Sequence, residues 1–268
     1  NNPSVTIASI IFVCSSKSSR PKTSIYHDSQ PFKKICYSGY SNPIGTVMYI
    51  LRSALTTFFI LTALVALHAH AENKWEPNIR KFEAADAKKM PAPGGIVFVG
   101  SSSMVFWKTD EGFPGLGIIN RGFGGSETSD SLEFADRIIL KYKPRIVAIY
   151  AGDNDIARGK SVDTVVNDTK KLFAKIHEAL PETKIIYVAI KPSLARWELV
   201  DQMRAANERI KKIAGKDDRI QFLDIDTPSL GPNGKPRREL FIKDGLHLSQ
   251  AGYDIWNDLM RPLLAIED

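Results

Sequence analysis

Between residues 94 and 264, short apolar runs rich in β-branched residues alternate with longer amphipathic stretches. Each run is continuous in apolar side chains, as expected for parallel strands that are covered on both faces. The alternation predicts one doubly wound α/β domain, a three-layer α/β/α sandwich around a parallel sheet of about five strands. The predicted strands are Ile96–Val99, Gly117–Asn120, Arg145–Tyr150, Lys184–Ile190 and Ile220–Asp224.

The amphipathic stretches predict the helices that cover this sheet. In the last stretch, Ala251, Ile255 and Leu259 recur every four residues and form one apolar stripe. Pro181 ends an earlier helix, and the Pro- and Gly-rich segment 228–236 predicts a surface loop. The predicted helices span about residues 76–89, 126–142, 161–180, 198–214 and 249–264. In such a fold, ligands bind outside the carboxyl ends of the strands, near the switch in strand order.

Residues 48–71 have the pattern of an export signal. Arg52, the apolar run 54–67 and the small-residue motif 69–71 follow in the order of a secretory signal peptide. The run has about 14 residues, fewer than the roughly 20 that span a bilayer as a helix. We expect cleavage near Ala71 and an exported protein, periplasmic or secreted, without a stable membrane anchor. An uncleaved anchor is the alternative.

Residues 1–47 are Ser-rich and lack sustained periodicity, so we expect them to lie outside the mature protein, with 72–268 as the folded domain. The net charge of +6 also arises mainly before residue 72, because 72–268 carries a net charge of only +1. A nearly neutral domain does not predict a nucleic-acid partner. Both cysteines, Cys14 and Cys36, precede residue 72, so the domain is expected to have neither a disulfide nor a thiolate metal site.

Two motifs follow the first two predicted strands. Gly100-Ser101-Ser102-Ser103 places a serine on a sharp strand-to-helix turn, which exposes its hydroxyl beside a helix N-terminus. Taken alone, the serine cluster fits a helix cap or an anion cradle equally well. The glycine-rich segment 120–126 lets backbone N–H groups approach a ligand closely, although a flexible turn also explains it.

Two further motifs lie after the third strand and before the last helix. In Gly152-Asp153-Asn154-Asp155, the asparagine can donate its side-chain N–H to an oxyanion, or can serve the turn itself. In Asp244-Gly245-Leu246-His247, a carboxylate three residues before an imidazole can orient the ring and stabilise its charged form. His177 lies instead within a predicted helix, where a structural role is expected. All four motifs can converge on one edge of the sheet.

Together, the four motifs resemble the conserved blocks of the SGNH (GDSL-type) hydrolases over about residues 94–264, and most closely the platelet-activating-factor-acetylhydrolase-like group. The resemblance implies a flavodoxin-like fold and a serine esterase. Its implied nucleophile is Ser102, its general base His247 and its orienting acid Asp244. The family usually has Asp before the nucleophile, where this chain has Ser101, so Ser101 and Ser103 stay open as alternative nucleophiles.

The resemblance further implies an oxyanion hole formed by the N–H groups of Ser102 and Gly125 and the side chain of Asn154, and it implies no metal or organic cofactor. The expected substrate is a small-molecule or glycan ester with a short acyl or acetyl group, since no long apolar lid segment is apparent. The side chains expected to contact it are Trp107, Phe123, Arg196 and Trp197. For Trp107, a place in the core is the alternative.

Three alternatives to a simple esterase are open at this point. An O-acetyltransferase or a carbohydrate acetyl esterase would use the same residues. A non-catalytic ligand-binding α/β module would be favoured if Ser102 and His247 lay far apart.

Overall fold

The computed structural model describes residues 73–264, and the predicted signal segment 48–71 lies outside this range. Five parallel strands form one sheet in the order β2-β1-β3-β4-β5. This is the doubly wound, flavodoxin-like order, in which the direction of winding switches between β1 and β3. The predicted fold class is confirmed. The strands are β1 (Ile96–Gly100), β2 (Ile119–Gly122), β3 (Ile146–Tyr150), β4 (Lys184–Val188) and β5 (Ile220–Leu223).

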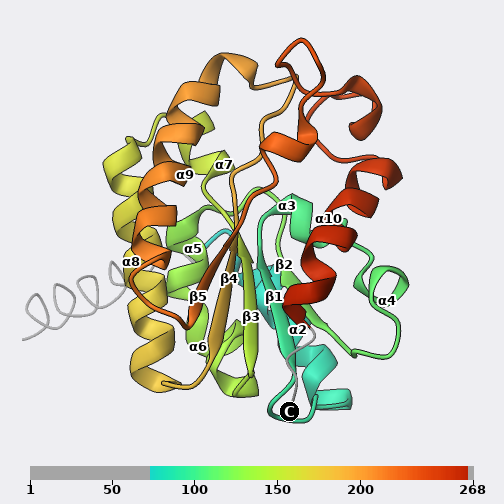
Figure 1. Ribbon diagram of the computed structural model, residues 1–268. Helices are drawn as coiled ribbons and strands as arrows, with labels where there is room; N and C mark the ends of the chain where they lie inside the picture. Colours follow the sequence, from blue (N-terminus) through green and yellow to red (C-terminus); the bar gives the residue numbers. More distant parts are fainter. Residues whose placement is uncertain (1–72, 265–268) are drawn as a thin grey trace, which may run out of the picture. The chain divides into compact units, whose positions relative to one another are not determined.

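Helices cover both faces of the sheet, as Figure 1 shows. The α-helices are α2 (Glu76–Lys88), α3 (Ser102–Val105), α4 (Thr109–Gly112), α5 (Thr128–Glu133), α6 (Ala135–Ile138), α7 (Asp153–Ala157), α8 (Val162–Ala179), α9 (Val200–Ala214) and α10 (Gln250–Leu264). The 3-10 helices are η1 (Leu140–Tyr142), η2 (Trp197–Leu199), η3 (Thr227–Ser229) and η4 (Arg238–Leu240). Helices α5, α6, α8 and α9 lie on one face, and α10 lies on the other with α3 and α4 (Figure 1).

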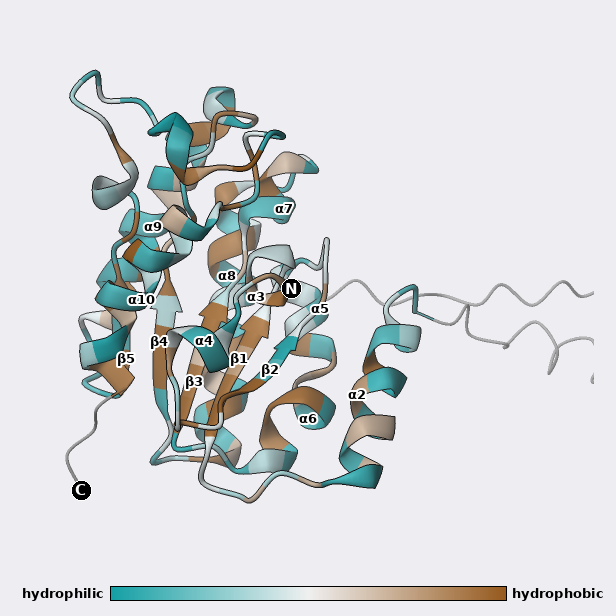
Figure 2. Ribbon diagram, turned by 90° about the vertical axis from the view of Figure 1, so that its right-hand side faces the viewer, coloured by the Kyte–Doolittle hydropathy of each residue, from teal (hydrophilic) through white to brown (hydrophobic). Residues whose placement is uncertain are grey.

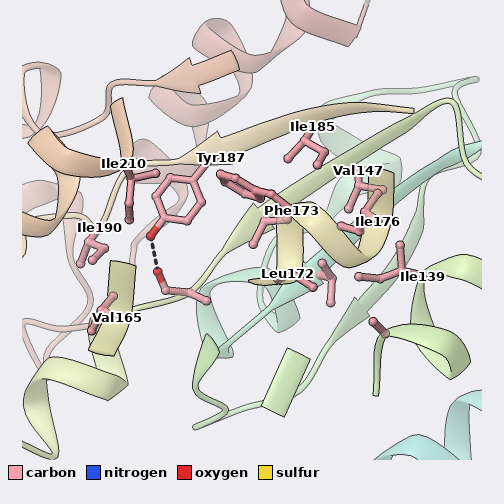
Figure 3. Close-up of a cluster of buried hydrophobic side chains, with 14 of the residues drawn as sticks. Ile139, Val147, Val165, Leu172, Phe173, Ile176, Ile185, Tyr187, Ile190 and Ile210 are labelled. Carbon is pink, nitrogen blue, oxygen red and sulfur yellow. Dashed lines mark hydrogen bonds between the residues drawn. The ribbon is translucent and has the colours of Figure 1, made fainter. Parts of the chain in front are cut away.

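The apolar runs of the sequence become the buried centre of the sheet. Every residue of β1 and β3 is buried, whereas the edge strands β2 and β5 expose part of their side chains. Hydropathy follows this arrangement, with brown strands between helices whose outer faces are teal (Figure 2). Figure 3 shows part of one apolar layer, in which Phe173 and Ile176 of α8 lie with Ile185 and Tyr187 of β4. Burying a side chain of this size stabilises the fold by about 1.5–3 kcal/mol.

The fourth strand ends at Val188, two residues before the predicted end, and two further differences have a local backbone cause. The second strand was expected at Gly117–Asn120 and begins two residues later, at Ile119, because Gly117 has a left-handed φ of 58°. The single helix expected over 126–142 is broken into α5, α6 and η1. Its apolar spacing is continuous, yet Ile139 leaves the helical region with φ −128° and ψ −67°. Apolar periodicity reports which side is buried and does not report such breaks.

Within residues 73–264, no helix combines the length and the apolar character needed to cross a bilayer.

Candidate active site

Ser102 is the first residue of α3 and stands directly beyond the carboxyl end of β1. The turn before it needs a glycine: Gly100 has φ 139°, and a Cβ there would overlap the Tyr150 carbonyl oxygen of β3. The Ser101 N–H donates to that same carbonyl at 3.1 Å, which ties the turn to the neighbouring strand. Ser101 and Ser103 are each only 2% exposed, whereas Ser102 is half-buried. Of the three adjacent serines, only Ser102 is accessible to a ligand.

The imidazole of His247 bridges Ser102 and Asp244. Its Nε2 lies 2.9 Å from the Ser102 Oγ, and its Nδ1 lies 2.7 Å from Asp244 Oδ2. The remaining carboxylate oxygen, Oδ1, accepts the backbone N–H groups of Leu246 and His247 at 2.8 and 3.0 Å. The Asp244 carboxylate, the His247 ring and the Ser102 hydroxyl therefore form one hydrogen-bonded series, although Ser102 and His247 are 145 residues apart in the chain.

The hydrogen bonds also fix the charge of Asp244. Desolvation acts to raise the pKa of this carboxyl, but hydrogen bonds from the His247 ring and from two backbone N–H groups outweigh it and lower the pKa to about 2. Asp244 is therefore ionised at neutral pH. An ionised carboxylate on Nδ1 holds the ring with Nε2 facing the Ser102 hydroxyl and stabilises the ring when it takes up a proton.

The glycine-rich loop after β2 lies beside the serine. A Cβ on Gly124 would lie 3.9 Å from the Ser102 Cβ, so the loop backbone passes close to this residue. Gly125 has φ 82°, a conformation that favours glycine. Among the acceptors of residues 73–264, none contacts the backbone N–H of Ser102 or of Gly125. Both donors are therefore available to a ligand.

Asn154 reaches this edge from the first turn of α7, which follows β3. Its Nδ2 donates to the Ser126 carbonyl at 2.9 Å, and its Oδ1 accepts two N–H groups of Arg196, each at 3.2 Å. The side chain is 8% exposed. The turn before it depends on Gly152, whose φ is 109°. Nδ2 carries a second hydrogen, for which residues 73–264 provide no acceptor.

The four side chains expected to contact a substrate lie in different surroundings. Phe123 is fully buried and packs edge-on against Trp75 and Phe134, which corrects the expectation that it contacts a ligand. The guanidinium of Arg196 forms an ion pair with Asp153 and donates hydrogen bonds to Asn154 Oδ1. Trp197 is half-buried under the guanidinium of Arg204 and does not line the cavity that lies beside His247.

Trp107 combines a core position with a place in a cavity wall. It is 2% exposed, and its Nε1 donates to Asn257 Oδ1 at 2.7 Å. It also forms part of the wall of a cavity of about 320 Å³ beside His247. At the mouth of this cavity, Phe106 and Ile242 are 52% and 47% exposed, and the Phe106 ring meets the His247 ring edge-on at 5.1 Å between centroids. The cavity gives an apolar group a place next to the imidazole.

A buried ion pair in this region was not predicted from the sequence. Lys191, three residues beyond β4, is 1% exposed, and its Nζ lies 3.1 Å from Asp153 Oδ2. Asp153 is also paired with Arg196. A lysine at the end of the apolar run 185–190 was the available signal, since buried charges occur almost only in pairs.

The described residues contain no cluster of three or more His, Cys, Asp or Glu side chains that could hold a metal ion. A hydroxyl, an imidazole and a carboxylate are hydrogen-bonded to one another, and two backbone N–H groups and the Asn154 amide lie in the turns at the same edge of the sheet. This set has the types of groups that acyl transfer requires: a nucleophile, a base, and donors for a developing oxyanion.

Comparison with known proteins agrees with this chemistry. Residues 108–255, more than half of the chain, match the GDSL-like lipase/acylhydrolase family. The chain belongs to this family. It is therefore a hydrolase of the esterase and lipase type. The matched region begins after Ser102 and includes Gly125, Asn154, Asp244 and His247. A search of curated proteins gave no match.

Solved structures show the same fold. A platelet activating factor-like protein from Streptococcus pneumonia is 22% identical, with a TM-score of 0.65 over 76% of this chain and 99% of that one. A GDSL-like lipase from Bacteroides thetaiotaomicron is 23% identical, with a TM-score of 0.62 over 70% and 97% of the two chains. A variant of an acetyl-xylooligosaccharide esterase from Geobacillus Stearmophilus is 18% identical, with a TM-score of 0.51 over 67% and 97%.

Proposed function

We propose that this member of the family hydrolyses carboxylic esters with short acyl groups through a covalent acyl-enzyme, with Ser102 as nucleophile, His247 as general base and Asp244 as its orienting acid. The observation that carries the proposal is the hydrogen-bonded series from Asp244 through His247 to the accessible Ser102 hydroxyl. Ester hydrolysis in general is the activity of the family.

In the proposed first step, Ser102 Oγ bonds to the ester carbonyl carbon while its proton passes to His247 Nε2. Negative charge develops on the former carbonyl oxygen. The N–H groups of Ser102 and Gly125 and the amide of Asn154 are the proposed donors to this oxygen. Imidazolium then gives its proton to the alcohol oxygen as that bond breaks, and the acyl group stays on Ser102. Water then attacks the acyl carbonyl carbon while His247 takes its proton. His247 returns this proton to Ser102 Oγ as the bond to the acyl group breaks, and the carboxylic acid is released.

The cavity beside His247 is the proposed binding site for the alcohol part of the substrate. Because His247 protonates the departing oxygen in this mechanism, the group attached to that oxygen lies on the His247 side, where Phe106 and Ile242 offer apolar contacts. A volume of about 320 Å³ lies at the lower end of the range of about 300–1,000 Å³ for ligand pockets. This size favours a small alcohol part over a bulky one.

An acetylated carbohydrate is a second candidate substrate. The cavity wall also holds the polar side chains Lys108, Gln250 and Asn257, which can exchange hydrogen bonds with hydroxyl groups. The Geobacillus neighbour is named for an acetylated oligosaccharide, although its likeness to this chain extends to the fold alone.

A panel of p-nitrophenyl esters with acyl chains from two to about twelve carbons tests the acyl preference, and an acetylated xylooligosaccharide tests the second candidate. We expect kcat/KM to be highest for the shortest chains. Product analysis with an added sugar acceptor separates hydrolysis from acetyl transfer. The proposal is wrong if none of these esters is cleaved, or if Ser102→Ala cleaves them at the normal rate.

A further inference from the structure

A buried group of charges lies directly behind Asn154. Asp153 is 4% exposed and Lys191 is 1% exposed, and the Arg196 side chain is 20% exposed. Arg196 pairs with one oxygen of the Asp153 carboxylate, and Lys191 Nζ lies 3.1 Å from the other. Tyr150, fully buried, donates its hydroxyl to the same Oδ2 at 3.1 Å and accepts from Lys191 at 3.2 Å. The end of β3, the segment after β4 and the first turn of α7 are joined here.

This group fixes the orientation of the Asn154 amide. Oδ1 faces two guanidinium N–H groups, and Nδ2 faces the Ser126 carbonyl. If the amide rotated by half a turn, its NH₂ would face the donors of Arg196 and its oxygen would face the carbonyl oxygen. Both contacts would become repulsive. Only the observed orientation leaves one N–H of Nδ2 free at the edge of the sheet.

The group also carries an excess of positive charge. Within residues 73–264, the ion pairs of Arg196 and Lys191 are all made with Asp153, so two cations share one carboxylate. Desolvation acts to raise the pKa of Asp153, but the charges of Lys191 and Arg196 outweigh it and hold the pKa below its usual value. The carboxylate is ionised, and the sum over the group is one positive charge. Water screens this charge weakly, because the site is buried.

We infer that Arg196 and Lys191 are positioning residues for ester hydrolysis: Arg196 holds the Asn154 amide with its free N–H available, and the two cations place net positive charge behind that donor. The inference rests on the proposed function, in which Asn154 donates to the oxyanion. A fixed donor with positive charge behind it stabilises the transition state without reorganisation, and it acts on the oxyanion more than on the neutral ester. Neither residue is required to touch the substrate.

The first test compares Arg196→Met with Arg196→Lys, using steady-state hydrolysis of p-nitrophenyl acetate. We expect Arg196→Met to lower kcat by roughly tenfold with KM unchanged, because an interaction made in the transition state alone changes kcat and kcat/KM together. Arg196→Lys keeps the charge and restores part of the loss. Lys191→Met removes the excess charge and leaves the Arg196 contacts in place, so it should lower kcat less than Arg196→Met does. A rise in KM with normal kcat would contradict the inference and indicate a substrate contact.

The second test removes the amide that Arg196 holds. In an Asn154→Ala background, Arg196→Met should lower kcat much less than it does in the wild type, because only the charge of Arg196 is then lost and no longer its hold on the amide. An equal loss for Arg196→Met in both backgrounds would contradict the inference. Arg219→Met is the control, because Arg219 lies just before β5, at the opposite end of the sheet from Ser102, forms an ion pair with Asp217 and should leave kcat unchanged. Circular dichroism and the thermal midpoint identify any variant that fails to fold.

The outcomes separate this inference from the proposed function. Asn154→Ala is expected to lose on the order of 10²–10³ in kcat, the usual effect of removing one oxyanion donor. If Asn154→Ala is fully active, the proposed oxyanion hole is wrong. If Asn154→Ala is impaired while both cation variants are normal, the inference alone is wrong.

Discussion

Exposure distinguishes Ser102 from the serines on either side of it. The motif alone left Ser101 and Ser103 as alternatives, because three adjacent hydroxyl groups are equivalent in a sequence. In the fold, the Ser101 N–H is bound to β3 and the Ser103 carbonyl accepts the Tyr253 hydroxyl at 2.8 Å, so both flanking residues are held in the interior. The side chain between them is left to face His247.

Removing either side chain of the Ser102–His247 pair is expected to abolish nearly all ester turnover. Ser102→Ala and His247→Ala should each have this effect, and the double variant should be little worse than either, because residues that act as a unit are strongly non-additive. Steady-state kinetics on a short ester measures this. An organophosphonate should label Ser102, as identified by the mass of the modified peptide. A label on Ser101 or Ser103 would overturn the assignment.

Asp244 is expected to link stability to pH in the acid range. Its folded-state pKa of about 2 lies below the ordinary value of 3.8, so the ionised carboxylate stabilises the fold above about pH 4, and this contribution is lost as the pH falls through 2. Asp244→Asn should therefore unfold at a lower temperature than the wild type at pH 6. Near pH 2 the two thermal midpoints should converge. A difference that stays constant over this range would contradict the predicted link.

The same substitution should reduce kcat at neutral pH by an amount between the effects of Asn154→Ala and Ser102→Ala. The ring of His247 remains, but it loses the carboxylate that fixes its tautomer and stabilises its protonated form. Steady-state hydrolysis of p-nitrophenyl acetate measures the change. A kcat equal to that of the wild type would show that Asp244 has no part in the reaction.

The motif residues were more predictable from the sequence than the charges around them. Ser102 was expected at the carboxyl end of a strand, and Asp244 and His247 just before the last helix, so that they could meet at one edge of the sheet; the structure brings these side chains together. The pairing of Lys191 with Asp153 was missed because it depends on how the segment after β4 packs against α7. No spacing along the chain encodes that contact.

Among the elements, the central strands were the most predictable and the connections the least. The fully apolar runs of β1 and β3 could be recognised because burial on both faces leaves a continuous pattern. The break between α6 and η1 could not be recognised, because Ile139, where it occurs, is apolar and so are the residues before and after it. A change of backbone direction within an apolar stretch leaves no trace in hydropathy.

Two glycines at opposite ends of β1 provide a matched test of the turn before Ser102. Gly100→Ala should destabilise the protein by at least about 3 kcal/mol, because it combines a φ of 139° with a clash against the β3 backbone. Gly95→Ala, just before the strand, meets its nearest atoms at 3.8 Å and should change stability by less than about 1 kcal/mol. Urea unfolding measures both. Equal effects would mean that the turn tolerates a side chain.

At the scale of the whole chain, we propose export with removal of residues 48–71. The motivation is the signal-peptide pattern of these residues, which lie outside the described range. N-terminal sequencing of the exported protein should find Glu72, or a residue within a few positions of it, at the start. A membrane-associated protein that retains residue 48 would contradict the proposal.

The separation of 145 residues between Ser102 and His247 has a consequence for the time at which the protein becomes active. Chains are synthesised from the N-terminus, and the parts made first begin to fold first. His247 lies after all five strands, so the whole sheet has been made before both residues exist. No nascent or C-terminally truncated chain ending before His247 holds the pair. Recovery of ester hydrolysis during refolding therefore reports the late step that brings the segment of His247 against α3.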